Sequence, residues 1–273
     1  PGWYMEGMAE LLGTHRWHEG QLSLRHFPAS REVTPMWVRI KRVRESDPLP
    51  IAGVMGFRPG RALSTDQYAW CWALCKFLDS HPRHQEKFRE SWKLITQDES
   101  NKREFNRNFR KLFDRQLHEL EMDWQAFIAA LDYGYDLSRM AIEHGEGIRE
   151  PKGETVEVLA DRGWQSTSWH LRPGRKYQLS AKGRFQIAHD TEPWPCEPDG
   201  VTIEYHNGQP LGKLVGVLRP LGPRSKIDFS QPLPLGSRAT IEPARESILY
   251  LRVNDSASRL SDNKGSLRVT LSE

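Results

Sequence analysis

The sequence predicts a multidomain protein of mixed class, with a mainly α-helical N-terminal domain followed by an antiparallel β-sandwich. Up to about residue 150, apolar residues recur every three to four positions, which is typical of helices packed on a core. Beyond that point the chain changes to short alternating runs separated by Pro-Gly, Asp-Gly and Asn-Gly turns, which is typical of a sandwich or barrel. The stretch between is polar. We therefore expect domains at 1–147 and 156–273, joined by a linker at 148–155.

A series of helices is expected in the first domain. The first spans Tyr4–Leu12. Ser64-Thr65-Asp66 offers an N-cap for a strongly apolar helix that ends before His81-Pro82. The same periodicity predicts three more helices, at Gln85–Thr96, Asn101–Phe113 and Met122–Leu131. The intervening stretch is less regular and contains several prolines, and Trp37–Ile40 suggests a short strand within it.

The second domain is expected to be built from short strands at regular spacing. The predicted strands are Thr155–Leu159, Lys176–Ala181, Val201–Tyr205, Lys213–Leu218, Ile248–Val253 and Ser266–Leu271.

Charge and composition exclude two classes of partner. Lysine and arginine number 39 against 36 aspartates and glutamates, so the strong basic excess of a nucleic-acid-binding surface is absent from the sequence. No apolar run approaches the roughly 20 residues of a transmembrane helix. Cys71 and Cys75 lie four apart in a helical pattern, where buried free thiols are common, and no Cys-x-x-Cys spacing exists.

Two glutamates share one face of the first predicted helix. Glu6 and Glu10 are four residues apart, and Gly7 and Ala9 beside them allow another helix to approach closely. One interpretation is that both are solvent-facing charges on an amphipathic helix. The other is that a cation neutralises them, since burying a lone carboxylate is costly. A zinc ion held by histidines of another helix would take Glu6 as a ligand, with Glu10 orienting an imidazole.

The stretch Pro1–Glu10 resembles the Trp-x-x-Glu-Gly-x-Ala-Glu helix of peptidase-MA-like gluzincin metallopeptidases. Tyr68–Leu74 is similar to their downstream Tyr-Ala-x-x-Trp-Ala-Leu helix, and Phe88–Trp92 and Leu120–Phe127 are similar to the helices that follow. The resemblance covers about the first 135 residues. It implies that Glu6 is a zinc ligand and that Glu10 supports catalysis by orienting a zinc-bound imidazole without binding the ion itself. It also makes Tyr68 a candidate transition-state hydrogen-bond donor, although such a tyrosine is more often part of the core.

The His-Glu-x-x-His helix of that family is not in this sequence. His15, His18 and His26 are expected to be surface or structural residues, and His81-Pro82-Arg83-His84 contains a proline that spoils a helical ligand pair. Zinc is therefore expected only if an upstream segment of the same peptidase domain completes the site, and catalysis is not expected from this chain alone. The resemblance also implies an extracytoplasmic location, periplasmic or secreted, in a bacterium.

A second group of oxygen-bearing side chains brackets the last predicted loop. Asn254-Asp255 follows one strand, and Asp262-Asn263 precedes Gly265 and the next strand. Ca²⁺ prefers six to eight oxygen ligands, and such a loop supplies carboxylates, an amide and carbonyls. The alternative is a polar Asx-turn hairpin that binds nothing.

This segment resembles the calcium loop of galactose-specific PA-IL-like lectins. Gly163–Thr167, Leu171–Gly174, Leu179–Gly183 and Leu211–Leu214 match further landmarks of that family in the same order, over nearly all of 156–273. The resemblance implies calcium ligands from the side chains of Asp255, Asp262 and Asn263 and from the carbonyls of Arg259 and Ile187. A sugar would be held by Asp255 with Glu197 and Asp199. The family's His-Pro-x-Gln loop is replaced here by Cys196–Gly200, which puts galactose specificity in doubt.

Two functions from different classes follow from these patterns. The chain is either part of an extracytoplasmic zinc metallopeptidase carrying a calcium- and carbohydrate-binding sandwich, or a non-enzymatic carbohydrate- or protein-binding module on a degenerate peptidase scaffold. The first predicts an orphaned apolar face around Met5, Met8 and Leu12, and the second predicts none.

Overall fold

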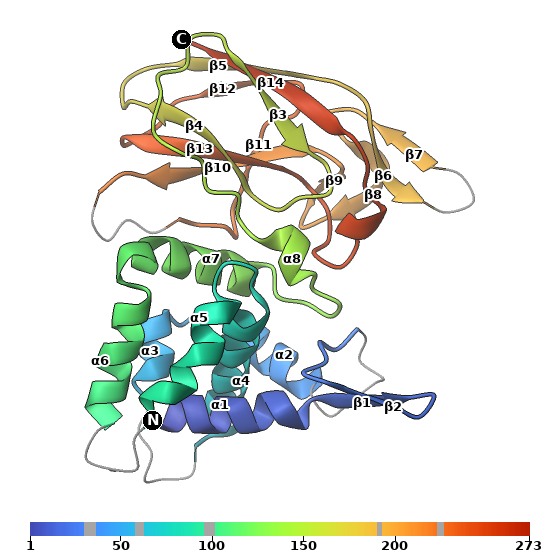
Figure 1. The fold of residues 1–273 in the computed structure, drawn as a ribbon. Helices are drawn as coiled ribbons and strands as arrows, with labels where there is room; N and C mark the ends of the chain where they lie inside the picture. Colours follow the sequence, from blue (N-terminus) through green and yellow to red (C-terminus); the bar gives the residue numbers. More distant parts are fainter. Residues whose placement is uncertain (30–36, 58–62, 96–101, 190–192, 223–226) are drawn as a thin grey trace. The chain divides into compact units, whose positions relative to one another are not determined.

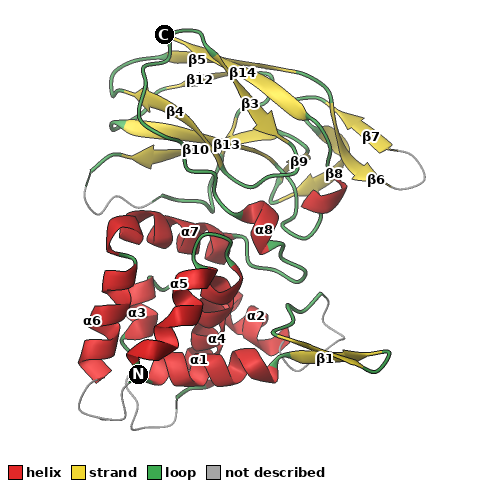
Figure 2. Ribbon diagram, viewed as in Figure 1, coloured by secondary structure: helices red, strands yellow, loops and turns green. Residues whose placement is uncertain are grey.

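The computed structural model describes residues 1–29, 37–57, 63–95, 102–189, 193–222 and 227–273. The chain divides into two compact units, a helical unit at Pro1–Ser138 and a β unit at Arg139–Glu273 (Figure 1). Figure 2 shows the helices concentrated in the first unit and the strands in the second. The predicted fold class, helices followed by an antiparallel β-sandwich, is confirmed.

The helical unit begins with a long helix and a short hairpin. Its elements are α1 (Gly2–Gly13), β1 (His15–His18), β2 (Gln21–Leu24), α2 (Trp37–Glu45), α3 (Ile51–Met55), α4 (Thr65–Ser80), α5 (Gln85–Glu90), the 3₁₀ helix η1 (Ser91–Leu94), α6 (Lys102–Leu112), the 3₁₀ helix η3 (Asp114–Gln116), α7 (Leu117–Ala129) and α8 (Leu137–Met140), which crosses the division between the units. Thr96 and Asn101, at the ends of two predicted helices, lie outside the described residues.

The predicted strand at Trp37–Ile40 is wrong, because these residues begin helix α2. The β-branched Val38 and Ile40 suggested a strand. However, the buried positions are Ile40 and Val43, three residues apart, and they pack toward α4 with the period of a helix.

Helix α4 forms the centre of this unit. Ser64, the first of the three residues expected to offer a cap, is its N-cap: its hydroxyl accepts a hydrogen bond from the backbone N–H of Gln67, and the Gln67 side chain accepts one from the backbone N–H of Ser64. Every residue from Ala69 to Asp79 is buried, so α4 is covered on all sides. Helix α1 crosses it at Gly7, where a Cβ atom would lie 2.5 Å from the carbonyl oxygen of Cys71. Gly7 therefore permits the close approach that the sequence suggested.

The β unit contains two four-stranded antiparallel sheets, in the strand orders β11-β10-β13-β4 and β12-β5-β14-β3. Two short hairpins, β6–β7 and β8–β9, extend from them. The strands are β3 (Thr155–Leu159), β4 (Gln165–Leu171), β5 (Tyr177–Lys182), β6 (Phe185–His189), β7 (Pro193–Cys196), β8 (Val201–His206), β9 (Gln209–Leu211), β10 (Leu214–Pro220), β11 (Leu233–Pro234), β12 (Arg238–Ile241), β13 (Ser247–Val253) and β14 (Ser266–Ser272), with the 3₁₀ helix η4 (Leu260–Asp262) between the last two.

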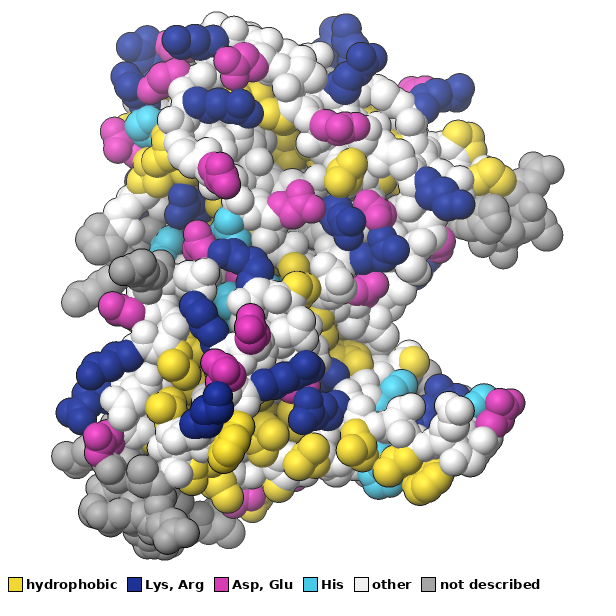
Figure 3. Space-filling model, in the orientation of Figure 1, with side chains coloured by type: hydrophobic (Ala, Val, Ile, Leu, Met, Phe, Trp, Pro, Cys, Tyr) yellow, Lys and Arg dark blue, Asp and Glu magenta, His cyan; other side chains and the backbone are white. Residues whose placement is uncertain are grey.

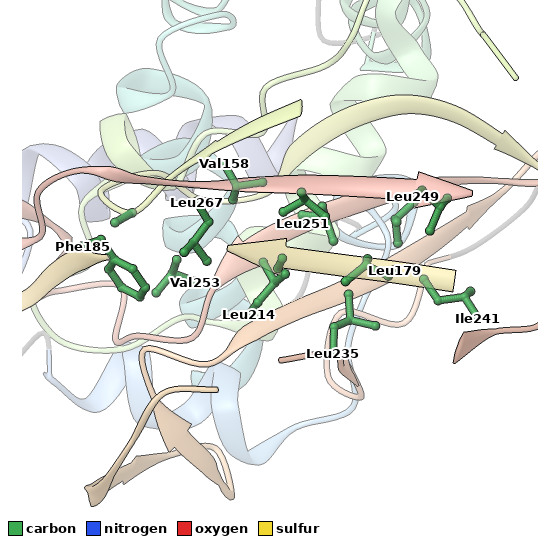
Figure 4. Packing of buried hydrophobic residues seen from close by; sticks show 14 of the residues in the cluster. Val158, Leu179, Phe185, Leu214, Leu235, Ile241, Leu249, Leu251, Val253 and Leu267 are labelled. Atoms are coloured by element: carbon green, nitrogen blue, oxygen red, sulfur yellow. The ribbon is translucent and has the colours of Figure 1, made fainter. Parts of the chain in front are cut away.

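The core of the β unit lies between the two sheets, where alternate side chains from both meet (Figure 4). Strand β14 shows the pattern, because Leu267, Val269 and Leu271 are buried while the residues between them are more exposed. Burial of this face holds the register of β13 and β14, and with it the ends of the loop that connects them.

Residues 148–155 pair with the β unit. The backbone N–H of Arg149 donates to Ser168, and the backbone of Arg149 accepts from His170, so the chain runs beside β4 before entering β3. Among the described residues, no helix is long and apolar enough to cross a membrane.

Candidate metal and ligand sites

The loop between β13 and β14 gathers the acidic and amide side chains singled out in the sequence. Strand β13 ends at Val253 and delivers Asp255 into the loop, and η4 delivers Asp262 and then Asn263 on the way to β14. The Asn254 amide nitrogen donates to the carbonyl oxygens of His206, Gln209 and Pro210, which fastens the loop to the β8–β9 hairpin. Asn254 is therefore a structural residue of this loop.

The Asp255 carboxylate is fully buried. One oxygen accepts from the backbone N–H of Ser256 at 2.6 Å, and the other accepts from the Asn263 amide nitrogen at 3.0 Å. Burial raises the pKa of Asp255, and the nearby charge of Asp262 adds to the rise, whereas these hydrogen bonds and the charge of Arg259 oppose it. The site thus holds a carboxylate at a position where its charge is costly.

Asn263 is buried beside Asp255 with its amide oxygen unsatisfied. Its amide nitrogen donates to Ala160 and to Asp255, both at 3.0 Å, which fixes the orientation of the amide. The opposite atom, Oδ1, is buried and finds no hydrogen-bond partner within the described part of the chain. A buried polar oxygen without a partner is unfavourable by itself and is suited to accept a cation.

Arg259 and Asp262 lie on the more exposed side of this loop. The carbonyl of Arg259, a predicted calcium ligand, accepts the backbone N–H of Asp262 at 3.3 Å and keeps a second lone pair. The guanidinium of Arg259 pairs with Glu204. Backbone hydrogen bonds between Gln186 and Lys264 place β6, and with it the neighbouring Ile187, alongside the loop. The loop therefore brings together the residue types of the predicted ligand set.

The predicted sugar-binding residues Glu197 and Asp199 make other contacts. Glu197 is largely exposed and pairs with Arg184 at 3.1 Å. Asp199 accepts a hydrogen bond from the backbone N–H of Ser237 at 2.8 Å, and this bond lowers its pKa, with a further contribution from Lys213. Both carboxylates contribute to loop structure in these positions.

In the helical unit, Glu10 pairs with an arginine that the sequence analysis did not single out. The Arg39 guanidinium donates to both carboxylate oxygens of Glu10, at 2.9 and 3.0 Å, and lies 5.7 Å from the centre of the Tyr68 ring. Glu6 is half-buried, and burial together with the charges of Glu6 and Glu10 raises the pKa of Cys71 to about 12. Arg39 was missed because its segment was taken for a strand rather than a helix facing α1 and α4.

The helical unit also holds a histidine and aspartate cluster that the sequence analysis missed. His81 and His84, set aside because of Pro82, lie in the turn between α4 and α5, and their side chains meet that of Asp123 on α7. The turn brings the two rings together without a helical pairing. His15 and His18, by contrast, are exposed on the β1–β2 hairpin, and His26 is half-buried near Arg16 and Lys76.

A scan against protein-family models found no match, and no curated protein matches the chain. Among solved structures, the chain is similar to the N-terminal domain of EclA, a PllA-like lectin. The two share 19% sequence identity over 43% of this chain and 92% of that domain, with a TM-score of 0.31. A likeness at this level does not establish the function of the chain.

Proposed function

We propose that the β unit is a calcium-dependent carbohydrate-binding module, with its ion held in the loop between β13 and β14. The carboxylates of Asp255 and Asp262, the amide oxygen of Asn263 and the carbonyl of Arg259 would supply the protein ligands. The single observation that carries this proposal is the buried Asn263 oxygen, which has no hydrogen-bond partner among the described residues, beside the fully buried carboxylate of Asp255. A hard divalent cation would satisfy both groups at once.

Sugar would bind through the ion. Calcium accommodates up to eight oxygen ligands, so positions not filled by the protein remain for two neighbouring hydroxyls of a glycan. Arg259 and Glu204 lie beside the loop as a half-buried ion pair, and both can hydrogen-bond to a hydroxyl-bearing ligand. Glu197 and Asp199 remain candidates for contacts farther from the ion.

The first test is calorimetric titration of the purified chain with Ca²⁺ after treatment with a chelator. We expect one ion per chain in the wild type and none in Asp255→Asn. Glu242→Gln is a matched control, because Glu242 is an exposed carboxylate of the same unit that pairs with Lys176. Wild-type protein that takes up no calcium would refute the proposal.

Carbohydrate binding is tested separately, on a glycan array in calcium and in chelator. We expect binding only in calcium, and loss of that binding in Asn263→Ala. Calcium uptake with no glycan bound would retain the ion site and remove the lectin-like function.

A second candidate concerns the helical unit, which we propose as part of a zinc peptidase site with Glu6 as a ligand. The observation that favours it is an exposed apolar strip along α1 and the hairpin. The strip comprises Met5, Leu12, Trp17, Leu22 and Leu24, all at least 44% exposed. Figure 3 shows hydrophobic side chains gathered over this part of the unit. A further helix could pack on such a strip and so lie next to Glu6.

The complete open reading frame tests this candidate. If the expressed protein includes a His-Glu-x-x-His segment, we expect peptidase activity and a zinc ion at Glu6, and we expect Glu6→Gln to lose the activity and one equivalent of zinc. A protein that includes this segment but shows no peptidase activity leaves the non-enzymatic binding module as the better description.

A further inference from the structure

The turn between α4 and α5 holds three potential metal ligands in a buried position. His81 follows the last residue of α4 and His84 precedes the first residue of α5. The backbone N–H groups of His84 and Gln85 both donate to the carbonyl of His81 at 3.0 Å, which fixes the turn. Asp123 approaches from the middle of α7. Two side chains from this turn and one from α7 therefore lie close together.

The donor atoms lie close enough together for one metal ion to take the place of the hydrogen bond between Asp123 and His84. Asp123 Oδ2 lies 2.8 Å from Nε2 of His84 and 3.8 Å from Nε2 of His81, and ligand atoms of all three residues lie within 4.8 Å of one another. Zinc binds nitrogen and oxygen ligands at about 2.0–2.2 Å, so two ligands of a tetrahedral ion lie about 3.3 Å apart. The two measured distances bracket that value.

Burial makes the charge of Asp123 the main electrostatic feature of the cluster. The Asp123 and His84 side chains are 0% exposed and that of His81 is 4% exposed. Nη1 of Arg83 lies 3.8 Å from Asp123, and the same guanidinium also pairs with Glu119. A divalent ion bound by Asp123 would neutralise the carboxylate from within the cluster.

Aromatic rings close the cluster from several sides. The two imidazoles stack with ring centres 4.3 Å apart, Phe77 lies 5.2 and 5.8 Å from them, and Phe113 meets His84 edge-on at 6.0 Å. Nδ1 of His84 is buried and has no hydrogen-bond partner among the residues that the structure describes. The hydrogen bonds of the described residues therefore leave Nδ1 of His84 without a partner. If Nε2 of His84 bound zinc, Nδ1 would lack the hydrogen-bond acceptor that a zinc-bound histidine usually has.

We propose that His81, His84 and Asp123 bind a first-row transition-metal ion, zinc in the cell, which ties the α4–α5 turn to α7. Two imidazole nitrogens and one carboxylate oxygen favour zinc over calcium, which prefers oxygen ligands alone. The enclosing rings indicate a structural ion rather than one that meets substrate. This site is separate from the calcium loop and independent of it.

The test uses the full chain, which is unfolded in denaturant with a chelator, freed of the chelator and then refolded with the metal ion. The ion must be present during folding because its ligands are buried. Co²⁺ serves as the spectroscopic probe. We expect one Co²⁺ per chain with the visible d–d absorption of a tetrahedral ion containing nitrogen ligands, displaced by one equivalent of Zn²⁺. Refolding with Zn²⁺ should also raise the melting temperature above that of protein refolded in chelator.

Two variants assign the ion to these residues. His84→Gln and Asp123→Asn should each weaken metal binding by more than the roughly 10–100-fold that loss of an outer-shell partner costs. His18→Gln, which changes an exposed histidine on the hairpin, should leave the affinity unchanged. If either cluster variant fails to fold, the wild-type absorption spectrum still decides. Two results would overturn the proposal. One is a wild-type protein that shows no Co²⁺ bands, and the other is a folded Asp123→Asn variant that keeps them.

Discussion

Asp255 shows how one residue position links stability to ligand binding. This fully buried carboxylate accepts hydrogen bonds from Ser256 and Asn263 but is held where its charge is unfavourable, and burial is the main reason why its pKa is raised. A loop with a structural role alone would need no charged residue at this position. The cost is offset if a cation occupies the loop, so the raised pKa and the proposed calcium site have the same cause.

The pH dependence of stability should reveal this cost. Because the folded-state pKa of Asp255 is raised, folding favours the protonated acid. Its contribution is therefore most favourable below the ordinary pKa near 3.8 and is lost as pH rises through the folded-state value. In chelator, urea denaturation should show wild type gaining stability relative to Asp255→Asn as pH falls from 7 toward 4.

Calcium should reverse that trend. An ion at Asp255 favours the charged carboxylate, so in excess calcium the wild type should lose its advantage as the pH falls. At neutral pH, the amide nitrogen of Asp255→Asn would face one of two N–H donors, the Asn263 amide or the Ser256 backbone. The lost hydrogen bond should lower the free energy of unfolding by on the order of 1–3 kcal/mol. An Asp255→Asn difference that is independent of both pH and calcium would contradict this account.

The residues of the two candidate metal sites differ in how visible they are in the sequence. Asp255 and Asn263 lie eight positions apart in one loop, so alternation of the flanking strands is enough to place them together. His84 and Asp123 are 39 positions apart on different helices, and only the packing of α7 brings them together. A pattern search that requires a regular helix between the histidines rejects Pro82, although the turn formed there is what pairs the rings.

At the scale of elements, the α1–α4 crossing depends on the missing side chain of Gly7. A Cβ atom there would lie 2.4 Å from the Cys75 sulfur and 2.5 Å from the Cys71 carbonyl oxygen, and the second contact is with backbone that cannot rotate away. Gly7→Ala should separate the helices and destabilise the helical unit by about 1–3 kcal/mol. Circular dichroism during urea denaturation measures this.

Gly13→Ala is the matched control for the Gly7 variant. Gly13 lies on the same helix, and a Cβ atom there would meet nothing within 4 Å. Alanine favours helix over glycine by up to about 1 kcal/mol, so Gly13→Ala should be neutral or stabilising. Equal destabilisation by both substitutions would contradict this account, because Gly13 makes no such close approach to α4.

Helix α4 offers a second test at this scale, because its N-terminus is fixed by a reciprocal pair of hydrogen bonds between Ser64 and Gln67. Ser64→Ala removes one of them and should cost about 0.5–2 kcal/mol. Thr65→Ala, at the next position, keeps the cap and should change stability much less. A Ser64→Ala variant as stable as wild type in thermal denaturation would show that tertiary packing alone holds this end of α4.

Sequence patterns predicted those elements in which local signals and burial agree. The cap at Ser64 and the alternation in β14 are local, and their elements were predicted to within a residue at the ends concerned. Helix α2 was missed because its β-branched residues satisfy a strand pattern over four positions and a helical pattern only over seven. The partner of Glu10 was lost with it, since Arg39 is carried by α2.

At the scale of the whole molecule, each unit carries its own core and its own candidate metal site. The core of the β unit is formed by residues of that unit alone, from Val158 to Leu271, and the proposed calcium ligands all belong to the same unit. His81, His84 and Asp123 all belong to the helical unit. A ligand that binds one folded unit stabilises that unit by mass action, by about 2.7 kcal/mol at a hundred times its dissociation constant.

Hydrogen exchange of the full chain, read by mass spectrometry, should therefore separate the two ions. Calcium should slow exchange in peptides that cover β13, the following loop and β14, and leave α4 and α7 unchanged. Zinc added during refolding should protect the α4–α5 turn and α7 instead. Asp255→Asn should abolish only the first effect and Asp123→Asn only the second. Because each variant serves as the control for the other, protection by calcium in α7, or loss of both effects in one variant, would contradict the assignment of one ion to each unit.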